Sequence, residues 1–248
     1  MLRSSTSEVR LLALHGRYQN AIKNAQALSG IRLNKALGEN ETVECSKVPF
    51  VKKCVEFQDD IPTSKLEYQD GNTVQLVGVD APHIVTPKIR ISSKNIRTKP
   101  RDPSTLGLAC QTRAWYYEKD GVKTFGLEES IDHILEVARM HGPFDGLVGF
   151  SQGGCLGSLL LSQSFAETLG GNIGVFCSSY AYQDGLCFSP HIQSLHYFSR
   201  LDRMIRAEKS EKLCNSMNGQ SVEHGSGHHI PADEFHKTLH SFLFGKKE

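Results

Sequence analysis

One stretch of the sequence, GPFDGLVGFSQGGCLGSLLL at residues 142–161, constrains the fold more than any other. Its apolar first half predicts a buried strand at 145–150, and its second half predicts a helix that begins at Gln152. The two are joined by GFSQG, in which Ser151 has a glycine two residues away on either side. An ordinary loop does not need that spacing, whereas a very tight turn between a strand and a helix does.

The chemistry of such a turn depends on its two glycines. Gly149 and Gly153 would crowd each other, so each position must lack a Cβ atom. Ser151 is then expected in an unfavourable backbone conformation, at a cost of about 1–3 kcal/mol. Its hydroxyl stands at the carboxyl edge of the sheet, where ligands bind in open α/β folds. At the start of the helix, the free N–H of Gln152 and the positive dipole end would stabilise a developing oxyanion.

The rest of the chain alternates between apolar runs and helical patterns. Strands are predicted at residues 9–16, 172–179, 194–200 and 220–224. Helices are predicted at residues 20–38, 127–142, 152–170, 203–217 and 231–245. This alternation predicts an α/β fold, with a mostly parallel sheet and helices on both faces. Because no repeat, linker or low-complexity tract interrupts the chain, we expect a single domain over residues 1–248.

Two segments fit this pattern less well. Residues 40–73 are irregular, and two possible strands, at 53–60 and 73–82, lie in and after this region. Residues 84–110 hold six basic side chains between Lys88 and Arg101, with no acidic one among them. The interpretation without a functional role is a solvated surface loop. The functional interpretation is a cover near the active site that prefers anionic substrate groups.

Charge and composition exclude several classes of protein. Lys and Arg number 28 against 27 Asp and Glu, so the formal net charge of +1 gives no general attraction to nucleic acid or membranes. No apolar run approaches the ~18 residues of a membrane helix. The seven cysteines are scattered and contain no C-x-x-C pair, which argues against disulfides and zinc. We expect reduced thiols, a cytoplasmic location, no cofactor, and a small-molecule substrate.

A serine hydroxyl is a poor nucleophile unless a base takes its proton and an acid orients that base. The acid is expected just past a strand that follows the serine in sequence. Asp202 ends the segment SLHYFSRLD, and Asp184 is the rival. We favour Asp202 because it follows its strand more closely, and it could also cap the helix beginning near Arg203.

The base is expected in the loop before the last helix. The segment HGSGHH there offers His224, His228 and His229, and its glycines allow the loop to reach the serine. We prefer His228. A metal site on the three histidines is disfavoured because their spacing is not that of helical ligands, and no cysteine or carboxylate cluster completes it.

A second oxyanion donor is expected from the turn that follows the first strand, LALHGRYQN. This turn lies at the same sheet edge as Ser151. The backbone N–H of Arg17 is the preferred donor and that of Tyr18 the alternative.

Taken with their order, these motifs resemble those of the FSH family of serine hydrolases, a group of α/β-hydrolases that includes the ovarian-tumour-associated type. The resemblance covers nearly the whole chain and rests on LALHGRYQNA, VDAPH, AWYYEKDG, GLEESIDHI, GPFDGLVGFSQGG, LHYFSRLD and HGSGHHIP. GPFDG followed by GFSQGG is far more specific than G-x-S-x-G alone.

The resemblance implies an α/β-hydrolase fold, with Ser151 as nucleophile, Asp202 as acid and His228 as base. It also implies hydrolysis of carboxylic esters, with a leaning towards acyl chains, and some relatives resemble thioesterases. The sequence departs from the family in a longer stretch at 43–73 and in the basic segment at 88–101, and both are expected to flank the cleft.

Three functions follow as hypotheses. The first is a metal-independent serine esterase that forms an acyl-enzyme. The second is an acyl-thioester hydrolase or lipid deacylase, motivated by the basic segment because coenzyme A and phospholipid head groups are anionic. The third is a hydrolase fold used only as a binding module, since a fold does not dictate a function.

Overall fold

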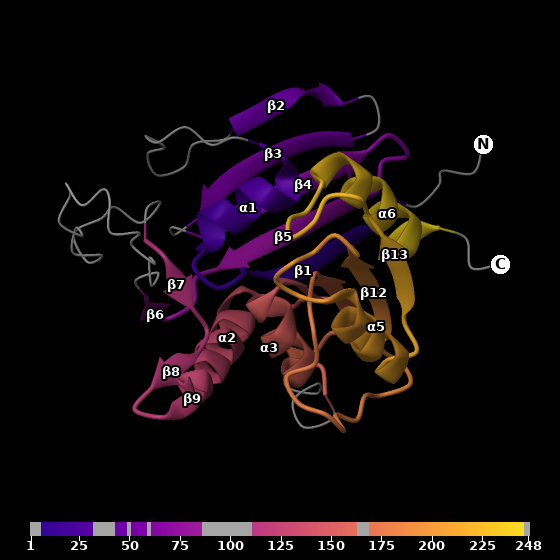
Figure 1. Ribbon diagram of the computed structural model, residues 1–248. Coiled ribbons are helices and arrows are strands. Elements are labelled where there is room, and N and C mark those ends of the chain that lie inside the picture. The colour runs from indigo at the N-terminus through magenta and orange to yellow at the C-terminus, as the bar shows by residue number, and fades with distance from the viewer. Residues whose placement is uncertain are drawn as a thin grey trace, which may run out of the picture.

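The computed structural model describes residues 6–31, 43–48, 51–58, 61–85, 111–162 and 169–245 (Figure 1). Within these ranges, nine strands form one sheet in the order β13-β12-β11-β10-β1-β5-β4-β3-β2. Two small antiparallel pairs lie beside it, β6 (His83–Ile84) with β7 (Arg113–Ala114) and β8 (Tyr117–Lys119) with β9 (Val122–Phe125). The main sheet positions every residue of the candidate site.

Most of the main sheet is parallel. Its parallel strands are β1 (Glu8–Leu14), β5 (Thr73–Val79), β10 (Gly146–Phe150), β11 (Ile173–Cys177), β12 (Gln193–Phe198) and β13 (Gln220–Glu223). Their carboxyl ends meet at one edge, as expected for open α/β sheets. The antiparallel strands β4 (Ile61–Tyr68), β3 (Val51–Gln58) and β2 (Val43–Val48) extend the sheet beyond β5.

Helices cover both faces of the sheet (Figure 1). On one face lie α1 (Ala21–Ser29) and α6 (Ala232–Phe244). On the other lie α2 (Leu127–His141), α3 (Gln152–Leu160) and α5 (Ala207–Ser216). The predicted mostly parallel sheet with helices on both faces is therefore confirmed.

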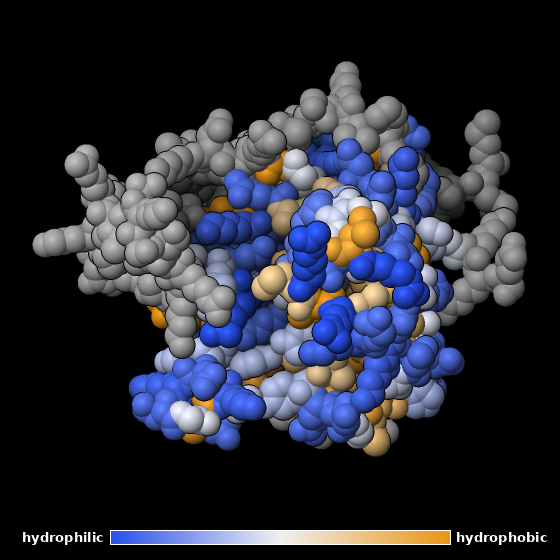
Figure 2. Space-filling view, viewed as in Figure 1, coloured by the Kyte–Doolittle hydropathy of each residue, from blue (hydrophilic) through white to orange (hydrophobic). Residues whose placement is uncertain are grey.

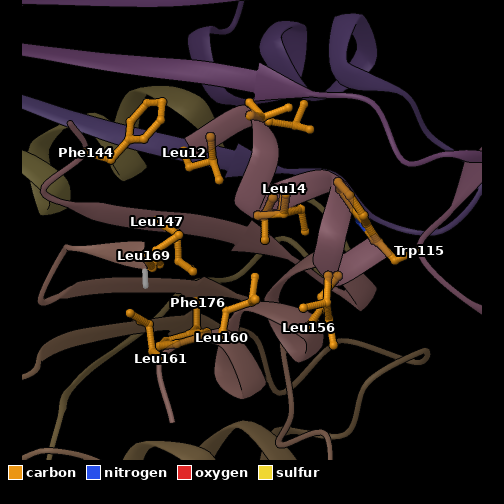
Figure 3. Packing of buried hydrophobic residues seen from close by; sticks show 14 of the residues in the cluster. Leu12, Leu14, Trp115, Phe144, Leu147, Leu156, Leu160, Leu161, Leu169 and Phe176 are labelled. Carbon is orange, nitrogen blue, oxygen red and sulfur yellow. The ribbon is translucent and has the colours of Figure 1, made fainter. Parts of the chain in front are cut away.

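The two layers follow from the period of two in the strands. Along β1, Leu12 and Leu14 belong to the core under α2, α3 and α5, whereas Leu11 and Ala13 belong to the core under α1 and α6. Figure 3 shows the first core, in which side chains of β1 and β10 face those of α3, with Trp115 at its edge near Leu14 and Leu156. Trp115 is completely buried.

The region between β1 and β5 differs from the prediction. The helix expected at 20–38 ends at Ser29, because Gly30 adopts a left-handed conformation (φ 73°) and its N–H donates to the carbonyl of Gln26. Residues 32–42 lie outside the described part. The stretch 43–79 forms four strands rather than two. Buried positions alternate along β4, but one of them is occupied by Ser64, and on β3 the buried Lys53 likewise obscures the apolar pattern.

Other expected elements have shifted ends. The helix expected from Arg203 begins at Ala207, because the N–H groups of Met204 and Ile205 are bound by Asp202 in a turn. The helix expected to run from Gln152 to Gly170 is described to Leu160. Of the basic segment 84–110, only Ile84 and Val85 are within the described part of the chain.

The face seen in Figure 2 is mostly hydrophilic, and apolar residues are exposed on it over α5, α6 and the loops beside them. Two strongly exposed apolar side chains, Leu201 (66%) and Met204 (73%), flank Asp202 on the loop after β12. We call them the apolar lip. None of the helices in the described ranges has the length and hydropathy required to cross a membrane.

A buried cation ties the antiparallel strands to α6. Lys53 on β3 is only 4% exposed, and its Nζ lies 2.6 Å from Oδ1 of Asp233 in the first turn of α6. The hydrogen bond from Lys53 holds the pKa of Asp233 below its ordinary value of 3.8, against a smaller opposing effect of burial. The pair therefore stabilises the fold when Asp233 is ionised.

We predict that Asp233→Asn destabilises the protein by about 1–2 kcal/mol, because it leaves a buried ammonium uncompensated. The cost is below that of a fully buried pair because the side chain of Asp233 is 68% exposed. Urea unfolding followed by circular dichroism measures it. In the unsubstituted protein this contribution is complete above pH about 4 and is lost as the pH falls through the lowered pKa. The neighbouring exposed Glu234→Gln is the control and should change stability by less than about 0.5 kcal/mol.

Candidate active site

Ser151 occupies the turn between β10 and α3. Its backbone has φ 52° and ψ −114°, a conformation that L-residues rarely adopt. The N–H of Ser151 donates to the carbonyl of Cys177 at the end of β11, 2.9 Å away, and this bond holds the turn against the neighbouring strand. The strained backbone predicted from the GFSQG pattern is therefore present.

Contacts at two glycines explain why the turn can close. A Cβ on Gly149 would overlap the Cα of Gly154 and lie 2.6 Å from its nitrogen. A Cβ on Gly153 would lie 2.5 Å from the carbonyl oxygen of His15, at the end of β1. Since these neighbours are backbone atoms, they cannot swing aside, and both glycines of the motif are required by close approach.

Asp202 and His228 are hydrogen-bonded to each other. Nδ1 of His228 lies 2.7 Å from Oδ2 of Asp202, whose side chain is 1% exposed. Oδ1 of the same carboxylate accepts the N–H groups of Met204 at 2.7 Å and Ile205 at 2.9 Å. Burial alone would raise the pKa of Asp202, but the hydrogen bonds from His228 and the two N–H groups hold it below its ordinary value. The carboxylate is thus ionised and fixed, and it orients the imidazole.

The rival acid lies on the surface. Asp184 is 82% exposed and forms an ion pair with Lys212 at 2.8 Å. Asp184 follows β11, as expected of the acid, but its side chain is paired with Lys212 on α5.

The other two histidines of the loop have structural surroundings. His224 is buried and stacks on Tyr197 at 4.6 Å between ring centroids, and its Nδ1 accepts the N–H of Ser226. Burial lowers the pKa of His224, which keeps the ring neutral and able to accept. His229 lies edge-on to His224 at 6.5 Å. His224 and His229 lie on the loop that carries His228, so their contacts help to hold that loop.

The imidazole of His228 packs on the residue next to the serine. Its ring centroid lies 4.9 Å from that of Phe150, which directly precedes Ser151. In the described part of the chain no hydrogen bond joins the Ser151 hydroxyl to His228. Catalytic hydrogen bonds are often long in a free enzyme and tighten with substrate bound.

Within the described ranges, one backbone N–H of the turn after β1, residues 16–19, is without an acceptor. The N–H of Gly16 donates to the side chain of Gln19, that of Tyr18 to the carbonyl of Arg113, and that of Gln19 to the carbonyl of Gly16. Among the described residues, the N–H of Arg17 has no acceptor. Tyr18, the alternative donor, is therefore engaged elsewhere, and Arg17 stays the predicted one. The N–H of Gln152 at the start of α3 is likewise without a protein acceptor in this part of the structure.

A segment at Arg113–Tyr116 connects the two predicted oxyanion donors, and we call it the brace. Arg113 exchanges two backbone hydrogen bonds of 2.8 Å with Tyr18 and Gln19 of the first turn. At its other end, the side chain of Gln152 accepts the N–H of Trp115 at 3.2 Å and donates to the carbonyl of Tyr116 at 2.8 Å. The brace thus fixes the turn after β1 relative to the start of α3.

His15 adds a second connection between the brace and the turn. Its carbonyl accepts the indole N–H of Trp115 at 2.8 Å, and its Nε2 accepts the N–H of Ala81 at 3.0 Å. Burial lowers its pKa to about 4, so the ring is neutral and its Nδ1 donates to the carbonyl of Gly16. The sequence alone does not predict these roles of His15, Trp115 and the Gln152 side chain. Partners about 40 and 100 residues apart leave no local signal.

Competing nucleophiles near Ser151 are inactive. Cys155 and Cys177 are each 1% exposed, as expected for core residues. Burial raises the pKa of Cys155 to about 11 and that of Cys177 above its ordinary range, so both thiols stay protonated at neutral pH. No group of three His, Cys, Asp or Glu side chains in the described ranges could hold a metal ion.

Comparison with known proteins gives a family. Residues 4–239 match the family model described as "Serine hydrolase (FSH1)". This match agrees with the resemblance found in the sequence motifs.

Individual relatives carry the word esterase in their names. The chain is 31% identical over 143 residues to "Esterase CG5412" of Drosophila melanogaster, covering 49% of this chain and 50% of that protein. It is 29% identical over 193 residues to "Esterase OVCA2" of Danio rerio, covering 68% of this chain and 83% of that protein. The matched part thus spans about half the length of the fly relative.

Solved structures share the fold. A Bacillus cereus carboxylesterase aligns over 98% of this chain and 91% of its own, with a TM-score of 0.52 and 12% identity. Acyl-protein thioesterase 2 of Zea mays aligns over 98% and 97%, with a TM-score of 0.51 and 15% identity. The predicted α/β-hydrolase fold is confirmed.

We predict that Gly149→Ala destabilises the protein by about 1–3 kcal/mol or more, because its methyl group must displace the backbone of Gly154. Urea unfolding monitored by circular dichroism measures the change. Gly225→Ala is the matched control, because a Cβ there meets no atom within 4 Å. Equal stability of the two variants would contradict the close approach in the turn.

Proposed function

Because the chain belongs to the serine hydrolase (FSH1) family, we propose that it hydrolyses carboxylic esters with Ser151, His228 and Asp202 as a catalytic triad. The observation that carries the proposal is the 2.7 Å hydrogen bond between His228 and the buried Asp202. This bonded pair packs on Phe150, beside a serine in a strained turn. The same constellation on other folds performs acyl transfer.

In the first half-reaction, Nε2 of His228 takes the proton of Ser151 while Oγ attacks the acyl carbonyl carbon. The carbonyl oxygen gains the negative charge and is held by the N–H groups of Gln152 and Arg17. Asp202 stays ionised and stabilises the imidazolium. The tetrahedral intermediate then expels the alcohol, which takes the proton from His228 and leaves an acyl-enzyme.

In the second half-reaction, water replaces the alcohol. His228 takes a proton from the water, and the hydroxide attacks the acyl-enzyme carbonyl with the same two N–H donors on the oxyanion. Collapse of the second intermediate breaks the bond to Oγ and returns the proton to Ser151. The products are a carboxylic acid and the free enzyme.

The apolar lip supports a substrate with an apolar portion. Leu201 and Met204 are exposed on either side of Asp202, where an acyl or alkyl chain would cover them. Ester and thioester carbonyls are both compatible with this mechanism. A function as a binding module alone gives no role to the bonded His228–Asp202 pair.

We predict that a fluorophosphonate probe labels the protein and that Ser151→Ala abolishes the label, because the probe reacts with an activated serine. In-gel fluorescence and intact mass measure one adduct per chain. Ser216→Ala, an exposed serine on α5, is the control and should label fully. Labelling that survives Ser151→Ala would disprove the triad, and absence of any label would favour the binding module.

We predict that Gln152→Leu lowers kcat for p-nitrophenyl esters by about 10–100-fold with a smaller change in KM, because the brace no longer aligns the two oxyanion donors. Trp115→Phe, which loses the indole bond to His15 and part of the buried ring but keeps the backbone bond to Gln152, should give a smaller loss of kcat. Steady-state kinetics with unfolding curves for each variant separates catalysis from stability. An effect on KM alone would contradict a role in the transition state.

A further inference from the structure

Two tyrosine hydroxyls and a thiol meet one helical turn beyond Ser151. The hydroxyl of Tyr116 donates to Sγ of Cys155 at 3.2 Å, and both groups are close enough to the hydroxyl of Tyr180 to act on its pKa. Tyr180 lies on the loop after β11, where Oγ of Ser179 donates to the carbonyl of Ser151 at 3.4 Å. The cluster therefore lies beside the proposed nucleophile, and it has no role in the proposed mechanism.

Two cationic side chains lie on the elements around Ser151. Nζ of Lys209, from α5, is 5.4 Å from the centroid of the Tyr180 ring. Arg17, from the turn that supplies the predicted oxyanion donor, has its guanidinium carbon 5.0 Å from the centroid of the Tyr18 ring, and its charge acts to lower the pKa of Tyr180. Burial nevertheless raises the pKa of Tyr180 to about 12, so the hydroxyl remains protonated at neutral pH.

These cations differ from their basic neighbours. Arg200 pairs with Glu211 and Glu223, and Lys212 pairs with Asp184. Arg17 and Lys209 are exposed, and within the described ranges neither forms an ion pair. In the described part of the chain, these two positive charges thus have no protein counter-charge.

We propose that Arg17, Lys209 and Tyr180 form a subsite for an anionic group of the substrate, a carboxylate or a phosphate. The proposal rests on the proposed function, because Ser151 defines the position of the subsite. The guanidinium can bind an anionic oxygen pair through two parallel N–H bonds, and Lys209 supplies a point charge. The substrate class is therefore an ester or thioester with an apolar portion on the lip and an anion a few bonds from the reacting carbonyl.

The anion can be carried by the acyl group or by the leaving group, and two matched substrate pairs distinguish these sources. Mono-p-nitrophenyl glutarate against p-nitrophenyl pentanoate tests the acyl side, because the two differ in a terminal carboxylate. Butyryl-coenzyme A against S-butyryl-N-acetylcysteamine tests the leaving group. The measured quantity is the ratio of kcat/KM for the charged member to that for the neutral member.

We expect this ratio to exceed about 10 in one pair, and we expect Arg17→Gln and Lys209→Gln each to lower it by about 5–10-fold. A ratio cancels any effect of Arg17→Gln on the oxyanion, which is common to both members. Lys212→Gln, a paired lysine on the same helix, is the control and should leave the ratio unchanged. Raising the salt concentration should lower the ratio in the unsubstituted protein.

A ratio near 1 in both pairs, or a ratio that persists in the double variant, would overturn the subsite while leaving the hydrolase intact. Failure to turn over the neutral esters would count against the proposed function instead. In that case calorimetric titration with glutarate and glutaramide decides on the subsite. Tighter binding of glutarate that Arg17→Gln removes supports it, and equal binding of the two overturns it.

Discussion

The backbone conformation of Ser151 is the constraint on which the rest of the site depends. It persists because the surroundings permit no other path for the chain: the N–H of Ser151 is bound to the carbonyl of Cys177, and the flanking glycines pack against backbone atoms. The cost of the strained conformation, about 1–3 kcal/mol, is small beside the stabilisation available from a domain of this size. Because β10 and β11 are each paired with strands on both sides, the strain is carried by the interior of the sheet. A hydroxyl held in this way keeps its position without help from a flexible loop.

The other groups of the proposed site come from separate elements of the fold, and each element is held by hydrogen bonds or stacking contacts. Asp202 closes its own turn by accepting two N–H groups, which leaves one carboxylate oxygen for His228. The loop of His228 is held by the stacking of His224 on Tyr197. The brace links the turn after β1 to the start of α3. Each of these supports is a short hydrogen-bonded or stacked contact at the carboxyl edge of the parallel strands. Separate contacts thus hold Asp202 and the loop of His228, whereas the brace holds the two N–H donors relative to each other.

The parts that could be predicted from the sequence are those with a local signal. The turn at Ser151 was predictable because G-x-S-x-G constrains a few adjacent residues, and so were the strands of the second half, whose apolar runs are uninterrupted. Of the strands β2–β4, only β3 was anticipated, as a possible strand at 53–60. Its start was missed because the buried Lys53 breaks the alternation and its partner lies 180 residues away, and β4 was missed because a serine, Ser64, occupies one of its buried positions. The end of α1 was assigned to Gly38 although Gly30 ends it, since either glycine is a possible stop in the sequence alone. The contacts of the brace could not be predicted for the same reason as the ion pair of Lys53, because they join segments that only the folded chain brings together.

One consequence of the brace concerns spectroscopy. The chain has a single tryptophan, and it is Trp115. Its indole is wholly buried, donates to the carbonyl of His15 and lies 5.0 Å from the neutral ring of that residue. The tryptophan fluorescence of the protein therefore comes from one fluorophore, which lies in the segment that connects the two backbone donors of the proposed oxyanion hole. Quenching, emission maximum and anisotropy then report on that small region rather than on an average over the molecule, without any label being attached.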